Sequence, residues 1–409
     1  MFLIMFRKGR GRSSCGFLSA VYSAGFEGLL FLYLFQARRW LSLLFQSDDR
    51  MLELLWFVGY CVDFPAQLAD RIDGHWEWNR HVKYRAIKSG YLSVHRDVYQ
   101  QRVIRSLRLT PAGLEYIGQR DPKAQIHIMA RQDLNVGNRN ATDRIMRRHA
   151  QATALLMAYH AGAKFLPQEK PSLLAKPQAA SVPYDPAQFY YYFSHDFRQA
   201  LREKSDLVDA KASRLLGVLI HQHYGYLLYY TGHTRMYWLA GTEENVSAMV
   251  EQVLNIRGMP VTTFNEVIIG SRMSVAQKLM RQGKHVHSRY FTLSPHCNSI
   301  FFVTNDRRGD ALFSIIVDQQ KQLEINRVAL SDFVPPKESR FYDAMTPDGR
   351  RPVILGYTCD LLTFSDLSAF MPGFEEPTIV LCYDYQLNTI QSLVKTPTEV
   401  RIMKGGDTS

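Results

Sequence analysis

The chain has 409 residues, of which 46% are hydrophobic and 21% are charged, and its formal net charge is +11. This composition excludes an intrinsically disordered, collagen-like or low-complexity chain, and the length suggests two or three domains. Its five cysteines are scattered without a short C-x-x-C spacing, which argues against a zinc finger and against a disulfide framework. We therefore predict a protein of the reducing cytoplasm.

Residues 1–48 form an apolar and basic N-terminal extension. Basic residues flank an apolar stretch, 16–35, of about membrane-spanning length, but Glu27 lies in its middle. Because a charge near the middle of a span is costly, we expect no membrane segment here. The alternatives are a membrane anchor, a helical hairpin packed on the next domain, and an extension upstream of a start at Met51.

Residues 49–121 predict a winged helix-turn-helix, a module that lays one helix into a groove of DNA. An apolar helix at residues 51–58 is followed by a second helix at 65–72, which begins at a proline. The third helix covers residues 79–88 and ends before Gly90, which can adopt the left-handed conformation that closes a helix.

The predicted wing has two strands, at residues 91–94 and 101–110, and Thr110 then caps another helix. Alternation in the second strand separates two sets of side chains. The inward set is Val103, Leu107 and Leu109, and the outward set is Arg102 and Arg108. Arg105 breaks this alternation, so the pattern does not predict its direction.

One face of the third helix is cationic, because Val82, Ala86 and Ile87 gather on the opposite side at 100° per residue. The predicted DNA-contacting residues are Asn79, Arg80, His81, Tyr84, Arg85 and Lys88 on this helix, and Arg96, Arg102 and Arg108 on the wing. Base readout is assigned to Asn79, Arg80, Tyr84 and Arg85. Arginine and asparagine suit this role because they can contact guanine and adenine edges through two hydrogen bonds. The wing arginines would contact phosphates.

The charge distribution favours this prediction over a winged helix that only docks proteins or dimerises. Residues 1–170 contain 25 Lys+Arg and 14 Asp+Glu, whereas residues 171–409 contain 24 of each. The whole excess of positive charge therefore lies in the part that carries the helix-turn-helix, as phosphate binding requires.

Residues 122–165 are expected to form a polar, irregular segment to about residue 140, followed by a helix at 143–161 with Thr142 as its N-cap. The first turns of this helix are basic, with Arg144, Arg147, Arg148 and His149. They could reach DNA while the apolar end packs or pairs with a second copy of the chain, or they could be a solvated surface. Residues 166–183, rich in proline and small residues, predict a linker.

Residues 184–397 alternate between strands and helices, which predicts a mixed α/β sheet domain, and residues 398–409 are expected to be a tail. The predicted fold class is therefore α+β, with an N-terminal winged helix-turn-helix followed by a mixed α/β sheet domain. The chain has neither a Walker A motif nor a Gly-x-Gly-x-x-Gly motif, so we expect no nucleotide cofactor.

The enzymatic alternative rests on His285-Val-His287, two histidines that would share one face of a strand and could share a metal. The motif is similar to the histidine-hydrophobe-histidine motif of rolling-circle and conjugative nicking enzymes, whose nucleophile is a tyrosine. A pair of ordinary surface histidines is the default interpretation, so we predict no enzyme and no metal site. Ser194-His195-Asp196 is not a catalytic triad, because neighbours in sequence cannot converge in the required geometry.

The passages Tyr84-Arg-Ala-Ile-Lys-Ser-Gly-Tyr-Leu92 and Arg105-Ser-Leu-Arg-Leu-Thr-Pro-Ala-Gly-Leu114 resemble the winged-helix half of the replication-relaxation family of plasmids and integrative conjugative elements. Residues 212–219, 226–232 and 380–386 look like a related downstream domain. The resemblance implies a protein of a mobile genetic element that binds double-stranded DNA and assists its replication or relaxation, or its transcriptional control. The resemblance implies no catalytic residues. The partners that it implies include replication or relaxation proteins of the same element. A membrane-anchored interaction scaffold is the other alternative.

Overall fold

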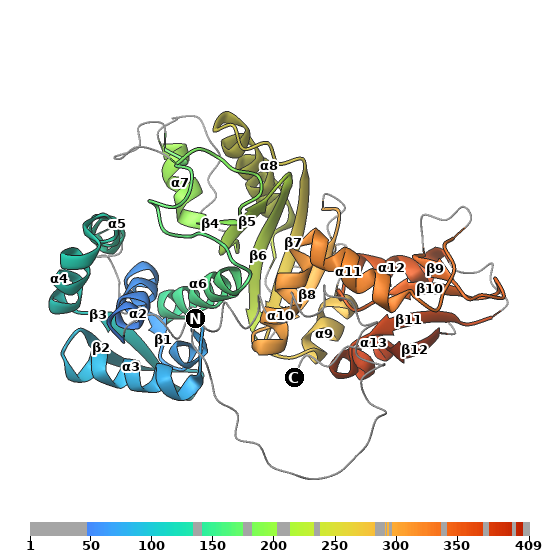
Figure 1. Cartoon of the computed structure of the whole chain (residues 1–409), viewed down its shortest axis with the longest axis horizontal. Coiled ribbons are helices and arrows are strands. Elements are labelled where there is room, and N and C mark those ends of the chain that lie inside the picture. Colours follow the sequence, from blue (N-terminus) through green and yellow to red (C-terminus); the bar gives the residue numbers. More distant parts are fainter. Residues whose placement is uncertain are drawn as a thin grey trace, which may run out of the picture. The chain divides into compact units, whose positions relative to one another are not determined.

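The computed structural model of the chain describes residues 47–133, 141–174, 182–202, 213–232, 238–282, 291, 293, 297–336, 342–370, 376–394 and 398–403. The chain divides into two compact units, residues 1–51 and 52–409, and the architecture below is that of the second unit. It is a mixed α+β fold with sheets of three, five and four strands (Figure 1). Among the described residues, no helix is long and apolar enough to cross a membrane. The apolar stretch at 16–35 lies outside them.

The first group of elements surrounds a three-stranded antiparallel sheet in the order β1-β3-β2. The elements are α2 (Ser47–Cys61), β1 (Phe64–Pro65), the 3-10 helix η1 (Leu68–Arg71), α3 (Trp76–Lys88), β2 (Leu92–Tyr99) and β3 (Arg102–Leu109). The helix predicted at 51–58 is part of α2. The helix predicted at 65–72 is shorter than expected, because Phe64 and Pro65 pair with Leu107 and Ser106 of β3.

Local sequence signals place the ends of α3 and of the helix after the hairpin. Gly90 follows α3 with φ of +73°, and the amide of Tyr91 donates to the carbonyl of Ala86 at 2.9 Å. Thr110 caps α4 (Pro111–Arg120) by accepting from the amide of Gly113 at 3.1 Å. The predictions for Gly90 and Thr110 are thereby confirmed.

Two helices follow where the sequence predicted one. Residues 122–133 form α5 (Pro122–Asp133), so the expected irregular segment is wrong there. Asp121 accepts from the amide of Ala124 at 3.0 Å, Pro122 takes the first helical position, and Ala124 and Ile128 are buried four residues apart. The N-cap at Asp121, the proline at the first helical position and the buried pair favour a helix here, although the segment is polar.

α6 (Thr142–His160) begins at the residue that was expected to cap it. The Thr142 hydroxyl donates instead to the Asp97 carboxylate on β2 at 2.8 Å, a contact between residues far apart in the sequence. Gly162, with φ of +90°, lies beyond the end of the helix, where a left-handed residue closes it.

The predicted linker is a packed segment as far as residue 174. Leu166 and Leu173 are buried, and the Lys170 ammonium donates to the carbonyl of Tyr191 at 2.8 Å and pairs with Asp196 at 3.2 Å. Proline-rich composition hid these buried contacts, so the linker prediction is wrong for residues 166–174. Residues 175–181 lie outside the described residues.

The five-stranded sheet has the order β4-β5-β6-β7-β8, from β4 (Tyr190–Phe193), β5 (Gly217–His221), β6 (Tyr224–Gly232), β7 (Thr263–Gly270) and β8 (Ile300–Thr304). Its first three strands are antiparallel and its last three are parallel. Parallel strands need crossovers, which here include α8 (Ala240–Ile256) and α9 (Ser274–Gln282). α7 (Ser194–Arg202) follows β4 directly.

The four-stranded sheet has the order β12-β11-β10-β9, from β9 (Ala344–Met345), β10 (Pro352–Leu355), β11 (Thr378–Cys382) and β12 (Thr398–Ile402). The helices in this part are α10 (Arg307–Ile316), α11 (Gln319–Ala329), α12 (Leu361–Phe370), η3 (Asp384–Gln386) and α13 (Leu387–Leu393). Residues 398–402 pair in parallel with β11, so they are not a tail. One hydrophobic core runs from Leu173 to Leu393 and includes residues of both sheets. The mixed α/β prediction for residues 184–397 is confirmed.

The N-terminal elements are joined to the sheets by buried polar contacts. The Asp310 carboxylate on α10 accepts from Arg71 Nη2 at 2.6 Å and from His160 Nδ1 at 2.9 Å. Helix α6 carries His160 and packs against α10, β5 and β6. Residues 52–409 are therefore one unit rather than two domains on a flexible linker.

Asp63 connects three elements through one buried carboxylate. It lies between α2 and β1, is fully buried, and accepts from Arg108 Nε on β3 and Arg148 Nη1 on α6, each at 2.5 Å. Removing this carboxylate would leave two arginines in the protein interior without a counter-ion.

We expect Asp63→Ala to lower the free energy of unfolding by about 3–5 kcal/mol, because two arginines would then be buried without their carboxylate. Urea unfolding followed by circular dichroism measures this change. Glu115→Ala removes an exposed carboxylate from α4 and should change stability by less than about 0.5 kcal/mol. Equal effects of the two substitutions would contradict this assignment.

Candidate nucleic-acid interface

The side of α3 opposite its buried residues is a cationic surface. Val82 and Ala86 pack into the core, whereas the predicted outer residues Arg80, His81, Tyr84, Arg85 and Lys88 are all exposed. Tyr84 exposes 63% of its surface although its ring is large and apolar. The predicted orientation of this helix is confirmed.

Two tryptophans extend this surface toward the start of the helix. Trp76 and Trp78 are exposed, and the Arg80 guanidinium lies over the Trp76 ring at 5.3 Å from its centroid. These tryptophans are absent from the predicted site because the predicted helix begins at Asn79. The signal in the sequence that could have found them was the pair of tryptophans within three residues of the predicted helix start.

Asn79 does not belong to the exposed surface. Its side chain is only 6% exposed, and Nδ2 donates to the carbonyl of Ile72 and to that of Asp70 at 3.4 Å. These bonds hold the 3-10 helix η1 against the start of α3. The assignment of base readout to Asn79 is therefore wrong, because its amide is used within the protein.

The hairpin of β2 and β3 brings two arginines together across its strands. The register pairs Arg96 with Arg105, and both side chains are exposed. Like charges directly opposite each other destabilise a hairpin. Neither arginine forms an ion pair with a carboxylate in the described part of the chain, so the pair is a place where an external anion would be stabilising. Arg105, whose direction the sequence left open, thus joins the candidate site.

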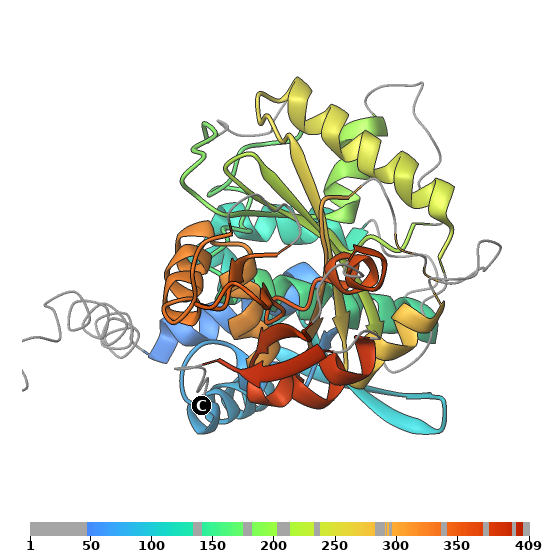
Figure 2. The same ribbon diagram turned by 90° about the vertical axis from the view of Figure 1, so that its right-hand side faces the viewer.

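The tip of the hairpin extends beyond the helices that cover its base (Figure 2). Leu92, Leu107 and Leu109 are buried at the base, but Val98 and its partner Val103 expose 61% and 64% of their surface. Val103 was predicted to face inward. The alternation itself is correct, but the core beneath the hairpin ends before the strands do.

The other face of the hairpin packs toward α6. Arg108, predicted to contact phosphate, pairs instead with the buried Asp63, so that prediction is wrong. Ser106 Oγ and His149 Nε2 lie 2.8 Å apart in a hydrogen bond, and burial lowers the pKa of His149 to about 4. Arg102 shares this face nearer the tip, opposite Tyr99, and is exposed.

The charge of the exposed surface depends more on where the charged side chains lie than on how many there are of each sign. Residues 49–121 contain 11 Lys+Arg and 9 Asp+Glu, so their net charge alone is small. Asp63 is buried between arginines, Asp70 pairs with Lys83 at 2.6 Å, and Asp97 accepts from the Thr142 hydroxyl. These contacts engage three carboxylates. Arg80, Arg85 and Lys88 on α3 stay exposed beside the single exposed carboxylate of that helix, Glu77, and the hairpin exposes Arg96 and Arg105.

The basic first turns of α6 are largely directed into the protein. Arg147 Nη2 donates to the carbonyls of Ser213 and Leu215, both at 3.1 Å, and Arg148 pairs with Asp63. The structure thus favours neither DNA contact nor a solvated turn for these two arginines.

The described residues offer no arrangement for the enzymatic alternative. His285 and His287 lie outside them. His195 Nε2 faces the Asp196 carboxylate at 2.8 Å, whereas Ser194 Oγ accepts from Arg198, so these neighbours do not form a serine nucleophile with its base. Within the described ranges, no group of three or more His, Cys, Asp or Glu side chains could hold a metal ion.

A buried carboxyl group in β7 makes the stability of the fold depend on pH. Burial is the main cause that raises the pKa of Glu266 to about 8, the negative charge of Glu243 raises it further, and a hydrogen bond with Cys297 opposes the rise. Between pH values of about 4.5 and about 8, Glu266 therefore keeps its proton in the folded chain and loses it in the unfolded chain.

We expect the free energy of unfolding to fall as the pH rises from about 4.5 to about 8. A group with a raised folded pKa contributes a slope of about 1.4 kcal/mol per pH unit in that window. Glu266→Gln should flatten the slope in urea unfolding measured across it, whereas Glu324→Gln, at an exposed site, should not. An unchanged slope in Glu266→Gln would show that this carboxyl is ionised in the folded chain.

No family model, curated protein or solved structure matches this chain. Two features of the described residues make up the candidate interface. The first is the exposed face of α3, and the second is the cross-strand pair of Arg96 and Arg105.

Proposed function

We propose that residues 49–121 form a winged helix-turn-helix that binds double-stranded DNA, with α3 in the major groove. The observation that carries this proposal is the exposed cationic and aromatic face of α3 beside the hairpin pair Arg96 and Arg105. An exposed helix is the element that the major groove admits, and phosphates compensate an exposed cationic surface. The order of helices followed by a hairpin also fits this class of module.

The proposal assigns different roles to the helix and the hairpin. Arg85 and Tyr84 lie mid-helix on the exposed face, where side chains can reach base edges, so base readout falls to them together with Arg80 and His81. Phosphate contacts fall to Lys88, Arg96, Arg102 and Arg105. Phosphate contacts set orientation and affinity but carry no direct sequence information.

The biological setting is proposed from the sequence resemblance. The chain would act in the cytoplasm on the DNA of a plasmid or integrative element, assisting replication, relaxation or transcriptional control. The sheets of residues 184–403 would then serve a second copy of the chain or another protein of the same element. Most of their strands are buried and the edge strand β12 is the exception, so partners would meet helices, loops or β12 rather than sheet faces.

Replacing Arg85 with alanine should weaken binding to a preferred duplex by about 1–3 kcal/mol and relax sequence preference, because a two-bond contact to a base edge is lost. The measurement is a titration of the full chain with a duplex selected by the wild-type protein from a random pool, and with a random duplex. Arg272→Ala removes one exposed positive charge from the loop after β7 and should preserve the preference. If Arg85→Ala weakened binding to both duplexes equally, Arg85 would contact phosphates rather than base edges.

The double substitution Arg96→Ala and Arg105→Ala should weaken all duplexes alike. Each lost phosphate contact lowers the slope of log affinity against log salt by about 0.9, so the double variant should lose a slope of about 2. The free energy of unfolding should not fall, because a repulsive cross-strand pair is removed.

The salt titration should use the full chain, because Arg71 and α6 are bonded into the rest of the fold. If the slope of log affinity against log salt were unchanged in the double variant, the hairpin would not contact the phosphates of the duplex. Absence of duplex binding by the wild-type chain at low salt would refute the proposed function.

A further inference from the structure

The two sheets of residues 184–403 differ in how their edge strands are covered. Segments outside the strands form main-chain bridges to three of the four edge strands, β4, β8 and β9. The bridges join Lys164 to Tyr190 of β4, Asp360 to Phe301 of β8, and Val334 to Met345 of β9. Within the described ranges, no segment forms such a bridge to β12, the outermost strand of the four-stranded sheet (Figure 1). An edge strand that is left uncovered can pair with another chain.

The main-chain groups of β12 alternate between its neighbour β11 and the uncovered side. The amide of Met403 donates to the carbonyl of Cys382 on β11 at 2.9 Å. Because the main-chain groups of successive residues in a strand point to opposite sides, those of Arg401 also face β11. The N–H and C=O groups of Val400 and Ile402 therefore face the uncovered edge.

The side chains of β12 carry opposite charges two residues apart. Glu399 and Arg401 share one face of the sheet, whereas Val400 lies on the other face and packs against the hydrophobic core. Glu399 Oε1 accepts from Arg401 Nε at 2.6 Å, and its Oε2 accepts from Arg351 Nη2 at 2.5 Å. The side chains of Glu399 and Arg401 are each 43% exposed. A carboxylate oxygen can accept two hydrogen bonds and a guanidinium group has five N–H donors, so both can bind a further charged group from outside the chain.

We propose that β12 pairs antiparallel with β12 of a second copy of the chain, about a two-fold axis at Val400. This axis pairs all five residues of the strand, and the two Val400 residues exchange two main-chain hydrogen bonds. Each Glu399 then lies opposite Arg401 of the second copy, and each Ile402, which is 55% exposed, lies opposite Thr398. Opposite charges on facing residues stabilise an antiparallel pair, so the strand is complementary to itself. The two four-stranded sheets join into one continuous sheet.

The interface is small, because each chain contributes one strand of five residues. The dimer should therefore dissociate on dilution. It depends on residues 398–402 and not on α3, so it stands whether or not α3 binds DNA.

The test measures the mass of the full chain by sedimentation over a range of concentrations, without DNA. The wild type should pass from the mass of one chain to the mass of two as its concentration rises. Arg401→Glu should raise the dissociation constant about tenfold or more, because it places a carboxylate opposite Glu399 of the second copy. Arg272→Glu reverses an exposed charge in the loop after β7 and should dimerise as the wild type does.

A charge exchange between two variants tests whether these residues face each other. Glu399→Arg should also weaken the dimer, because like charges would again face each other across the axis. An equimolar mixture of the Arg401→Glu and Glu399→Arg chains should form dimers, since every facing pair then has opposite charges. A mixture of the two folded variants that stayed monomeric would overturn the proposal, as would a wild-type chain that stayed monomeric at every concentration.

A second variant keeps the test decisive if Glu399→Arg, which also loses the contact with Arg351, does not fold by circular dichroism. Ile402→Pro removes an amide that faces away from β11, so it should keep the sheet intact and weaken the dimer. Dimerisation of Ile402→Pro equal to that of the wild type would overturn the proposal, because the two copies would then meet elsewhere. Arg85→Ala should dimerise as the wild type does. Failure of the DNA proposal and failure of the dimer proposal therefore give different results.

Discussion

The buried carboxylate of Asp63 is the interaction on which the N-terminal architecture depends. It lies where α2 passes into β1, and it binds Arg108 of β3 and Arg148 of α6. A buried ion of this kind contributes little net stability, but it is strongly destabilising when one partner is missing. The hairpin and α6 are thereby constrained to one relative position, which also places Ser106 against His149.

This constraint divides the hairpin into two functional faces. The face toward α6 uses its polar groups within the protein, through Arg108, Ser106 and Asp97. The opposite face is apolar at the base and cationic beyond it, where Arg96 and Arg105 are paired. Asp63 thus holds Arg108 away from solvent, whereas Arg96 and Arg105 on the other face stay exposed. Net charge counted along the sequence does not show this separation.

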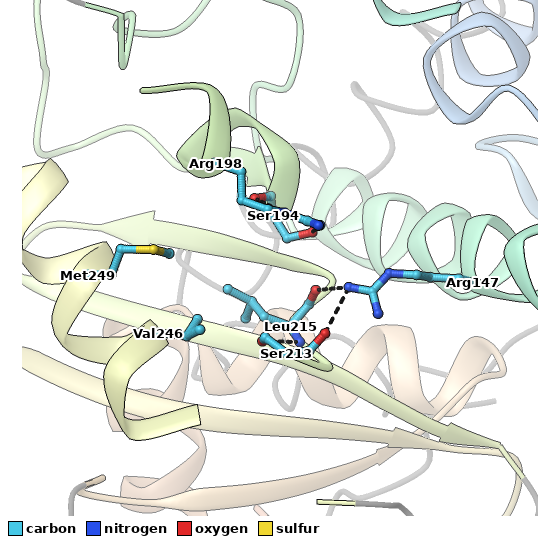
Figure 3. A pocket seen from close by; sticks show the side chains of 7 residues that line it. All are labelled: Arg147, Ser194, Arg198, Ser213, Leu215, Val246 and Met249. Atoms are coloured by element: carbon cyan, nitrogen blue, oxygen red, sulfur yellow. Dashed lines mark hydrogen bonds between the residues drawn. The ribbon is translucent and has the colours of Figure 1, made fainter. Parts of the chain in front are cut away.

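Helix α6 links the proposed DNA-binding elements to the rest of the fold. Its first turns contact the hairpin through Thr142 and the carbonyls of Ser213 and Leu215 through Arg147 (Figure 3). Its last turn reaches Asp310 through His160. Asp310 also binds Arg71, which precedes α3. The 3-10 helix η1 and helix α6 are thus bonded to the same carboxylate of α10.

Helix ends and helix faces could be predicted from the sequence, because they depend on residues close together in the chain. The exposed face of α3 and its closure at Gly90 follow from helix periodicity and from one glycine. The composition of the candidate site could not be predicted in full, because it depends on contacts between residues far apart in the chain. Asn79 is withdrawn from the surface by the carbonyl of Ile72, and Arg105 joins the candidate site only through its register with Arg96. The packed segment at 166–174 likewise depends on contacts between distant segments, which no local pattern encodes.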